Sequence, residues 1–151
     1  MHTILKVLTV TLLMFEAAGC GCTAVGCTDL FQVVFNKVST VWEPGSYVVS
    51  ISADGQQNTC TFDLPSVGGV NCTGNLQADL DVIGASGASN EIKGLNGVLI
   101  FGTPTLVQVT VARDGVNLGT NAFLPNYRED QPNGALCEPT CHVDGSELSV
   151  L

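Results

Sequence analysis

The sequence predicts an all-β protein, built as one antiparallel sandwich of about seven short strands behind a removable signal peptide. Three observations support this prediction. Apolar and polar residues alternate in short runs, two Asp-Gly pairs stand between such runs, and no stretch after residue 19 shows the 3.6-residue period of an amphipathic helix. A length of 151 residues is enough for one domain.

The strands are predicted where alternate side chains can share one buried face. After the turn at residues 42–45, for example, a strand is predicted with Tyr47, Val49 and Ile51 on one face. Its other face carries Val48, Ser50 and Ser52. The same period of two, or a bounded apolar run, marks the remaining strands. In chain order the seven predicted strands are residues 30–36, 46–53, 58–64, 76–82, 91–102, 107–111 and 116–124.

Turn-forming residues set the predicted boundaries. Asp54-Gly55 and Asp114-Gly115 are typical of two-residue hairpin turns, and each stands between two predicted strands. From residue 125 onward Pro, Asn, Asp and Gly dominate until a short apolar end. The expected organisation is a signal peptide at 1–19, a tether at 20–28, a sandwich core at 29–124 and a disulfide-held C-terminal segment at 125–151.

The N-terminus has the pattern of a lipoprotein signal peptide. Residues 1–6 carry one lysine, and the apolar run at 7–15 is shorter than the ~20 residues that cross a bilayer. The run leads to Ala17-Ala18-Gly19-Cys20, which resembles the bacterial lipobox, and this resemblance implies that the Cys20 thiol is acylated after removal of the leader. Gly21 then implies delivery to the outer membrane. Ordinary signal-peptidase cleavage and an uncleaved membrane-associated helix stay open as alternatives.

The number of cysteines is consistent with lipidation. The chain has seven, and assigning Cys20 to the lipid leaves six that can form three disulfides in an oxidising compartment. Six cysteines allow fifteen pairings. The most economical one joins Cys60 to Cys72 and joins the pair near the start to the pair near the end. The candidates for disulfide bonding are therefore Cys22, Cys27, Cys60, Cys72, Cys137 and Cys141.

The charge and hydropathy exclude two broad classes of protein. Five Lys and Arg against fourteen Asp and Glu give a net charge of −9, whereas a nucleic-acid-binding protein needs a basic face. Hydrophobic residues make up 45 % of the chain and the mean hydropathy is +0.33, which disfavours intrinsic disorder. We therefore expect a folded protein with no nucleic-acid partner.

Histidine is scarce in the mature chain, which excludes most metal sites that need two histidines. His142 is its one histidine, because His2 leaves with the leader. A zinc site would have to combine His142 with the terminal cysteines, which are expected to form disulfides instead. Asp79 and Asp81 project from one face of a strand and can be considered for calcium binding or glycoside hydrolysis, but a solvated strand face explains them. We expect no metal and no cofactor.

No motif indicates a catalytic residue. Ser86 lies in Gly84-Ala85-Ser86-Gly87, which lacks the spacing of a nucleophile elbow and is predicted to be a loop. Asn71-Cys72-Thr73 formally matches a glycosylation acceptor, a weak indication behind a bacterial leader. The expected protein is therefore not an enzyme.

Two aromatic residues are candidates for an exposed recognition surface. Trp42 stands in a turn and Tyr127 in a polar segment, although packing is a competing interpretation for Trp42. The remaining aromatics after the leader fall largely on predicted core faces, namely Phe31, Phe35, Tyr47, Phe62 and Phe101.

Several motifs together carry a family resemblance. These are the lipobox, Trp42-x-Pro44-Gly45-x-Tyr47-x-Val49, the Asp-Gly hairpins, and Pro132-Asn133-Gly134 followed by Cys137-x-x-x-Cys141. The chain thereby resembles small cysteine-containing bacterial lipoproteins with an immunoglobulin-like sandwich. The resemblance implies a non-catalytic, lipid-anchored envelope protein that binds a protein or glycan or has a structural role. An accessory subunit of a secretion or surface assembly, and a secreted hydrolase, are the alternatives.

Overall fold

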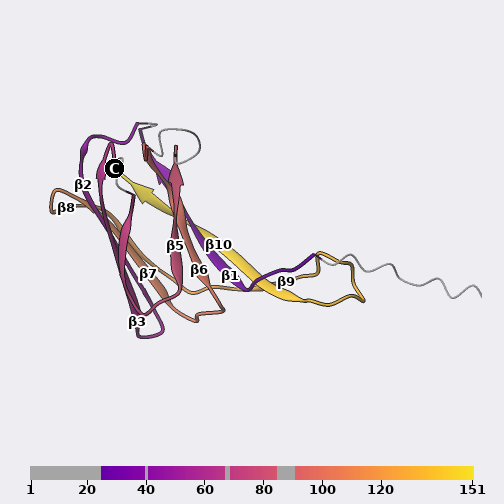
Figure 1. Ribbon diagram of the computed structural model, residues 1–151. Helices are drawn as coiled ribbons and strands as arrows, with labels where there is room; N and C mark the ends of the chain where they lie inside the picture. Colours follow the sequence, from indigo (N-terminus) through magenta and orange to yellow (C-terminus); the bar gives the residue numbers. More distant parts are fainter. Residues whose placement is uncertain (1–24, 40, 67–68, 85–90) are drawn as a thin grey trace, which may run out of the picture.

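The computed structural model describes residues 25–39, 41–66, 69–84 and 91–151, and its regular elements there are strands. Two five-stranded sheets have the orders β5-β6-β1-β10-β9 and β4-β3-β2-β7-β8 (Figure 1). This part of the chain holds no helix of the length and hydropathy that a membrane span requires. The strands are β1 (Leu30–Lys37), β2 (Gly45–Ala53), β3 (Gln56–Leu64), β4 (Asn71–Gly74), β5 (Ala78–Ile83), β6 (Gly94–Phe101), β7 (Val107–Arg113), β8 (Val116–Phe123), β9 (Arg128–Asp130) and β10 (Cys141–Val150).

The first sheet contains the one parallel pair among the described strands. β1 pairs with β10 in parallel from Leu30 opposite Val143 to Lys37 opposite Val150, while every other strand pair is antiparallel. The prediction of an all-β sandwich is confirmed. The prediction that its core ends at residue 124 is wrong, because β10 lies inside the sheet and buries Leu148 and Val150.

The second sheet contains both predicted hairpins. β2 and β3 are joined by Asp54-Gly55, and β7 and β8 by Asp114-Gly115. All four turn residues have positive φ, from 47° to 84°, as a type I′ turn requires. The Asp-Gly signal in the sequence was therefore a correct guide to two of the hairpins.

The core lies between the sheets and is crossed by a chain of aromatic rings. Phe35 of the first sheet is 6.5 Å from Trp42, and Trp42 is 5.6 Å from Tyr47 of the second sheet, measured between ring centroids. Tyr47 in turn stacks on Phe62 at 5.5 Å. Gly94 of β6 is required here, because a Cβ at that position would overlap the Trp42 ring. The aromatic chain thus joins the two sheets.

Three strands were not predicted as such. β4 and β9 have only four and three residues, and all of these are exposed. Neither strand therefore shows the alternation of apolar and polar residues from which a strand is predicted. β10 has ten residues, but its first inward positions, His142 and Asp144, are polar. The estimate of about seven strands is consequently too low.

The Asp54 side chain does more than form its turn. Its carboxylate accepts hydrogen bonds from the Thr105 backbone N–H at 2.9 Å, the Thr105 hydroxyl at 2.8 Å and the Leu106 N–H at 3.0 Å. These bonds, the Thr105 N–H foremost, hold the pKa of Asp54 below its ordinary value of 3.8. The hairpin turn is thereby fastened to the segment that enters β7.

Replacing Gly97 by Ala should destabilise the protein. A Cβ at Gly97 of β6 would overlap the Val33 carbonyl oxygen of β1, so the two strands would have to move apart. We expect the free energy of unfolding to fall by about 1–3 kcal/mol in urea titrations. Gly26→Ala is the control, because an added Cβ there meets no atom within 4 Å. Equal stability of the two variants would contradict the close approach.

Replacing Asp54 by Asn should lower the melting temperature in a pH-dependent way. Because its folded-state pKa is depressed, the carboxylate stabilises the fold above the unfolded-state pKa and loses this effect as pH falls through the folded-state pKa. The difference in Tm between wild type and variant should therefore be largest near neutral pH and shrink toward about pH 2.

The control for Asp54 is Thr105→Val, which removes one donor and leaves the carboxylate. It should cause a smaller loss of Tm, because the two backbone N–H donors remain. A Tm difference for Asp54→Asn that stays constant from neutral pH to about pH 2 would contradict the assignment.

Candidate functional site

The first candidate site is the point where the N-terminal segment joins the domain, here called the tether root (residues 25–29). In Figure 1 this segment leaves the sandwich beside β9 and the beginning of β10, while the C-terminus lies at the other end. A disulfide joins Cys27 to Cys141, the first residue of β10, with the Cα atoms 6.0 Å apart. The tether root is therefore covalently fixed to the last strand of the protein.

Hydrogen bonds hold the tether root on both sides of this disulfide. The Asn133 side chain accepts from the Val25 backbone N–H at 3.1 Å and donates to the Val25 carbonyl oxygen at 2.9 Å. Two residues beyond Cys27, the Asp29 carboxylate accepts from the His142 backbone N–H at 2.7 Å, which lowers the pKa of Asp29. The Asn133 amide thus pairs with the backbone of Val25 as a neighbouring strand would.

The cysteine pairings agree with the sequence prediction where the structure describes them. The Cys60–Cys72 disulfide is confirmed and joins directly opposed residues of β3 and β4. Cys27–Cys141 links the start to the end, as predicted. Cys137 is also disulfide-bonded. Cys20 and Cys22 lie outside the described residues, so the lipidation of Cys20 stays a prediction.

The other predicted chemical groups are not brought together into one site. Cys27 and Cys141 are bonded to each other, and His142 Nδ1 is 3.3 Å from an Asp29 oxygen. These two cysteines therefore do not form a zinc site with His142. Asp79 and Asp81 lie on the edge strand β5, and no group of three metal-ligating side chains gathers in the described ranges. Ser86 lies outside those ranges. Asn71 is exposed on β4.

Trp42 does not form an exposed recognition surface. It is only 8 % exposed and packs between Phe35 and Tyr47, with the Lys37 ammonium group 5.6 Å from its ring centroid. The interpretation of Trp42 as an exposed recognition residue is therefore wrong, because the turn that carries it folds back over the core.

Tyr127 is likewise occupied by the protein itself. Its ring lies 6.5 Å from that of Phe31, edge to face, and its hydroxyl donates to the Pro104 carbonyl oxygen at 2.9 Å. Burial, with a further contribution from nearby carboxylates, raises the pKa of Tyr127 to about 12, so the hydroxyl remains a donor. Tyr127 closes one end of the core, and the structure gives it no free recognition role.

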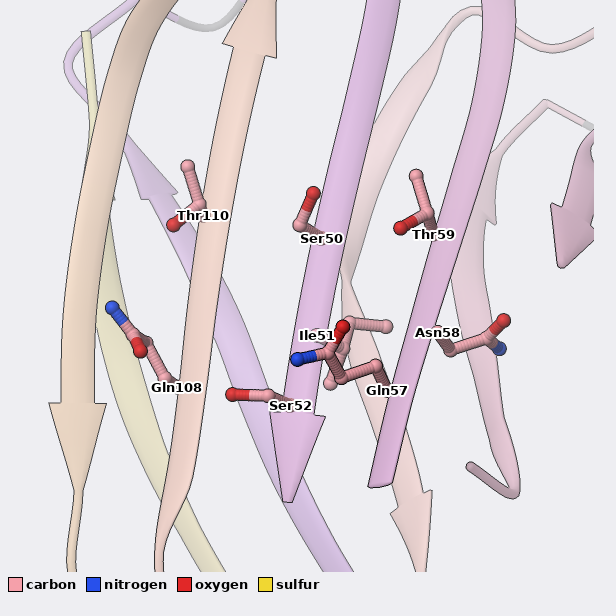
Figure 2. Close-up of a pocket in the computed structure, with 8 residues that line it drawn as sticks. All are labelled: Ser50, Ile51, Ser52, Gln57, Asn58, Thr59, Gln108 and Thr110. Carbon is pink, nitrogen blue, oxygen red and sulfur yellow. The ribbon is translucent and has the colours of Figure 1, made fainter. Parts of the chain in front are cut away.

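A second candidate site, which was not predicted, is a neutral polar surface on the second sheet. We call it the hydroxyl–amide face. Six of the eight side chains labelled in Figure 2 form it; they point outward and carry hydroxyl or carboxamide groups without formal charge, whereas Ile51 and Asn58 are buried. The six side chains form two rows across β7, β2 and β3, set by the strand register: Thr110, Ser50 and Thr59, then Gln108, Ser52 and Gln57.

The hydroxyl–amide face can form many hydrogen bonds with a partner, because hydroxyl and carboxamide groups both donate and accept them. It surrounds a shallow hollow of about 230 Å³, below the roughly 300–1,000 Å³ of pockets that enclose small molecules. The geometry therefore fits contact with an extended surface better than enclosure of a small substrate. In the sequence Ser50 and Ser52 alternate with apolar residues, which indicated an outward polar face on this strand. Only the sheet order shows that β3 and β7 place further polar side chains beside it.

Comparison of the chain with protein-family models, with curated proteins and with solved structures finds no match. The functional argument therefore depends on the chain's own geometry.

The two disulfides should contribute unequally to stability. In the chain-entropy account the Cys27–Cys141 bond, with a sequence separation of 114, is worth about 5 kcal/mol, and Cys60–Cys72, with a separation of 12, about 3 kcal/mol. Both variants are made in a Cys22→Ala/Cys137→Ala background, so that no second disulfide links the start of the chain to its end. There, urea unfolding of Cys27→Ala/Cys141→Ala should show the larger loss, with Cys60→Ala/Cys72→Ala as its matched control. A larger loss for the control would contradict this account.

Proposed function

We propose that the chain is a lipid-anchored, non-catalytic protein of the bacterial cell envelope that presents its sandwich to a protein or glycan. The single observation that carries the proposal is the covalent fixation of the tether root to β10 through Cys27–Cys141, seven residues after Cys20. An anchor at Cys20 would then hold the domain by a short tether that ends in a disulfide. The hydroxyl–amide face supplies a neutral surface for the partner.

The same chemistry supports the proposed compartment. Disulfides persist outside the reducing cytosol, and the chain carries a leader-like apolar run before Cys20. By resemblance to lipoproteins with Gly after the acylated cysteine, the proposed destination is the outer membrane. Because the C-terminus lies at the end opposite the tether root (Figure 1), the sandwich would extend away from the lipid surface.

We further propose that the sandwich is immunoglobulin-like. Its Tyr47 hydroxyl donates to the carbonyl oxygen of Glu43, four residues upstream, at 2.8 Å, which is similar to the tyrosine corner of that fold. One feature departs from the antibody pattern: Cys60–Cys72 joins neighbouring strands of one sheet instead of bridging the two sheets.

Reciprocal replacement of the two N-terminal cysteines tests the anchor. Cys20→Ser should abolish labelling by an alkyne fatty acid and leave Cys137 oxidised, since we assign Cys22 as its partner. Cys22→Ser should keep the label and leave Cys137 as a free thiol. The label is read by gel fluorescence and the thiol state by a maleimide mass shift after denaturation. A label that persists in Cys20→Ser, or a free Cys137 in that variant, would overturn the assignment.

A further inference from the structure

The outer face of the first sheet is apolar along its middle. Outward positions of a solvent-facing antiparallel strand are ordinarily polar. Here Val34 is 42 % exposed, and Phe101, which was predicted to lie in the core, instead points outward and is half-buried. We call the outward apolar side chains of β1, β6 and β10 the apolar stripe, which consists of Leu30, Val34, Leu99, Phe101 and Val143.

The strand register places the side chains of the apolar stripe next to one another, with the polar Gln32 of β1 among them, opposite Leu99. Leu30 of β1 stands between Phe101 of β6 and Val143 of β10, so three apolar side chains form one row. Farther along the same two strands, Val34 lies opposite Gly97, which has no side chain to cover it. The result is an apolar surface that runs along β6 and reaches Leu30 and Val34 on β1, on either side of Gln32.

Carboxylates flank the apolar stripe on both sides. On β5, Asp79 lies opposite Leu99 and Asp81 lies opposite Gly97, while on β10 Glu147 lies opposite Val34. The hydrogen-bond partners of Asp81 and Glu147 are the neutral amides of Asn96 at 3.4 Å and Asn36 at 3.3 Å. These partners leave the negative charge of the two carboxylates in place. One cation, Arg128 of β9, lies opposite Val143 at the far end of the stripe.

We propose that the apolar stripe binds a basic amphipathic segment of another protein, with apolar side chains on the stripe and Lys or Arg beside the flanking carboxylates. Interface centres are apolar and rims are polar, and complementary charge favours the correct partner. A second copy of this chain is a poor fit, because its five Lys and Arg against fourteen acidic residues would bring like charges together. This inference is separate from the anchor and from the hydroxyl–amide face.

A designed peptide tests the proposal directly. The probe is a synthetic peptide in which leucine and lysine alternate, titrated calorimetrically into the full protein in a non-ionic detergent, with the detergent solution as the blank. Asp79→Asn/Asp81→Asn and Val34→Thr/Leu99→Thr should each weaken binding about tenfold. Glu43→Gln/Asp63→Asn removes the same charge beyond this sheet and should change the affinity less than about twofold.

Any one of the following outcomes would overturn the proposal. A peptide of the same composition with its lysines and leucines in separate blocks, if it bound as tightly, would show non-specific charge attraction. Equal weakening by the Glu43→Gln/Asp63→Asn control would show the same. Concentration-dependent dimerisation that is lost in Val34→Thr/Leu99→Thr would assign the stripe to a second copy.

A second readout uses the wild-type protein and therefore does not depend on the folding of any variant. Amide chemical-shift changes in the wild-type protein on adding the alternating peptide should be largest in β1 and β6. Changes centred instead on β2, β3 and β7 would place the peptide on the hydroxyl–amide face and reject the stripe. The labelling experiment on Cys20 has no bearing on either result, so failure of the anchor and failure of the stripe are distinguishable.

Discussion

The parallel pairing of β1 with β10 is the constraint on which the rest of the structure depends. It joins the first described strand to the last over eight residue pairs. Without it the first sheet would separate into β5-β6-β1 and β10-β9, and the core would lose Leu148 and Val150. Pairing segments so distant in sequence has a large entropic cost of loop closure. The Cys27–Cys141 disulfide reduces that cost, because it joins the chain just before β1 to the first residue of β10.

The same pairing decides how a pull on the N-terminus would enter the domain. Since β1 and β10 are parallel, both begin at the end where the tether root leaves the sandwich (Figure 1). Force applied upstream of Cys27 reaches β10 through a covalent bond before it loads the hydrogen bonds between the strands. Asn133 adds a second attachment at Val25. The arrangement suits a domain held by one end.

Much of the second sheet could be predicted from the sequence, and much of the first could not. β2 and β7 bury alternate aliphatic side chains, and Asp-Gly turns define their hairpins, so period and turn chemistry agree. β10 lacks this agreement. His142 and Asp144 occupy inward positions at the end of the sandwich, where Asp29 and the backbone N–H of Asn126 provide polar partners. Because these inward residues are polar, the pattern of alternating apolar residues does not predict this strand.

The candidate surfaces were hidden for a different reason. A single strand shows which residues point outward, but a surface also depends on the order and register of its neighbours. Ser50 becomes part of a row only because β3 and β7 flank β2, and Leu30 only because β6 and β10 flank β1. The burial of Trp42 depended on neighbouring strands in the same way. Its place in a turn suggested exposure, but the strands around that turn bury it.

The sheet edges help to explain why recognition would use the faces. An exposed edge strand invites pairing with another chain unless it is short, charged or covered. β4 and β9 are short, and β5 carries Asp79 and Asp81. On β8, the Leu118 carbonyl accepts the Leu151 N–H at 3.1 Å, and the Asn121 side chain accepts the N–H of Ala122 at 2.9 Å. Each described edge thus has a feature that opposes strand addition, whereas the two outer faces, one neutral and polar and one apolar with an acidic border, stay open to partners of different chemistry.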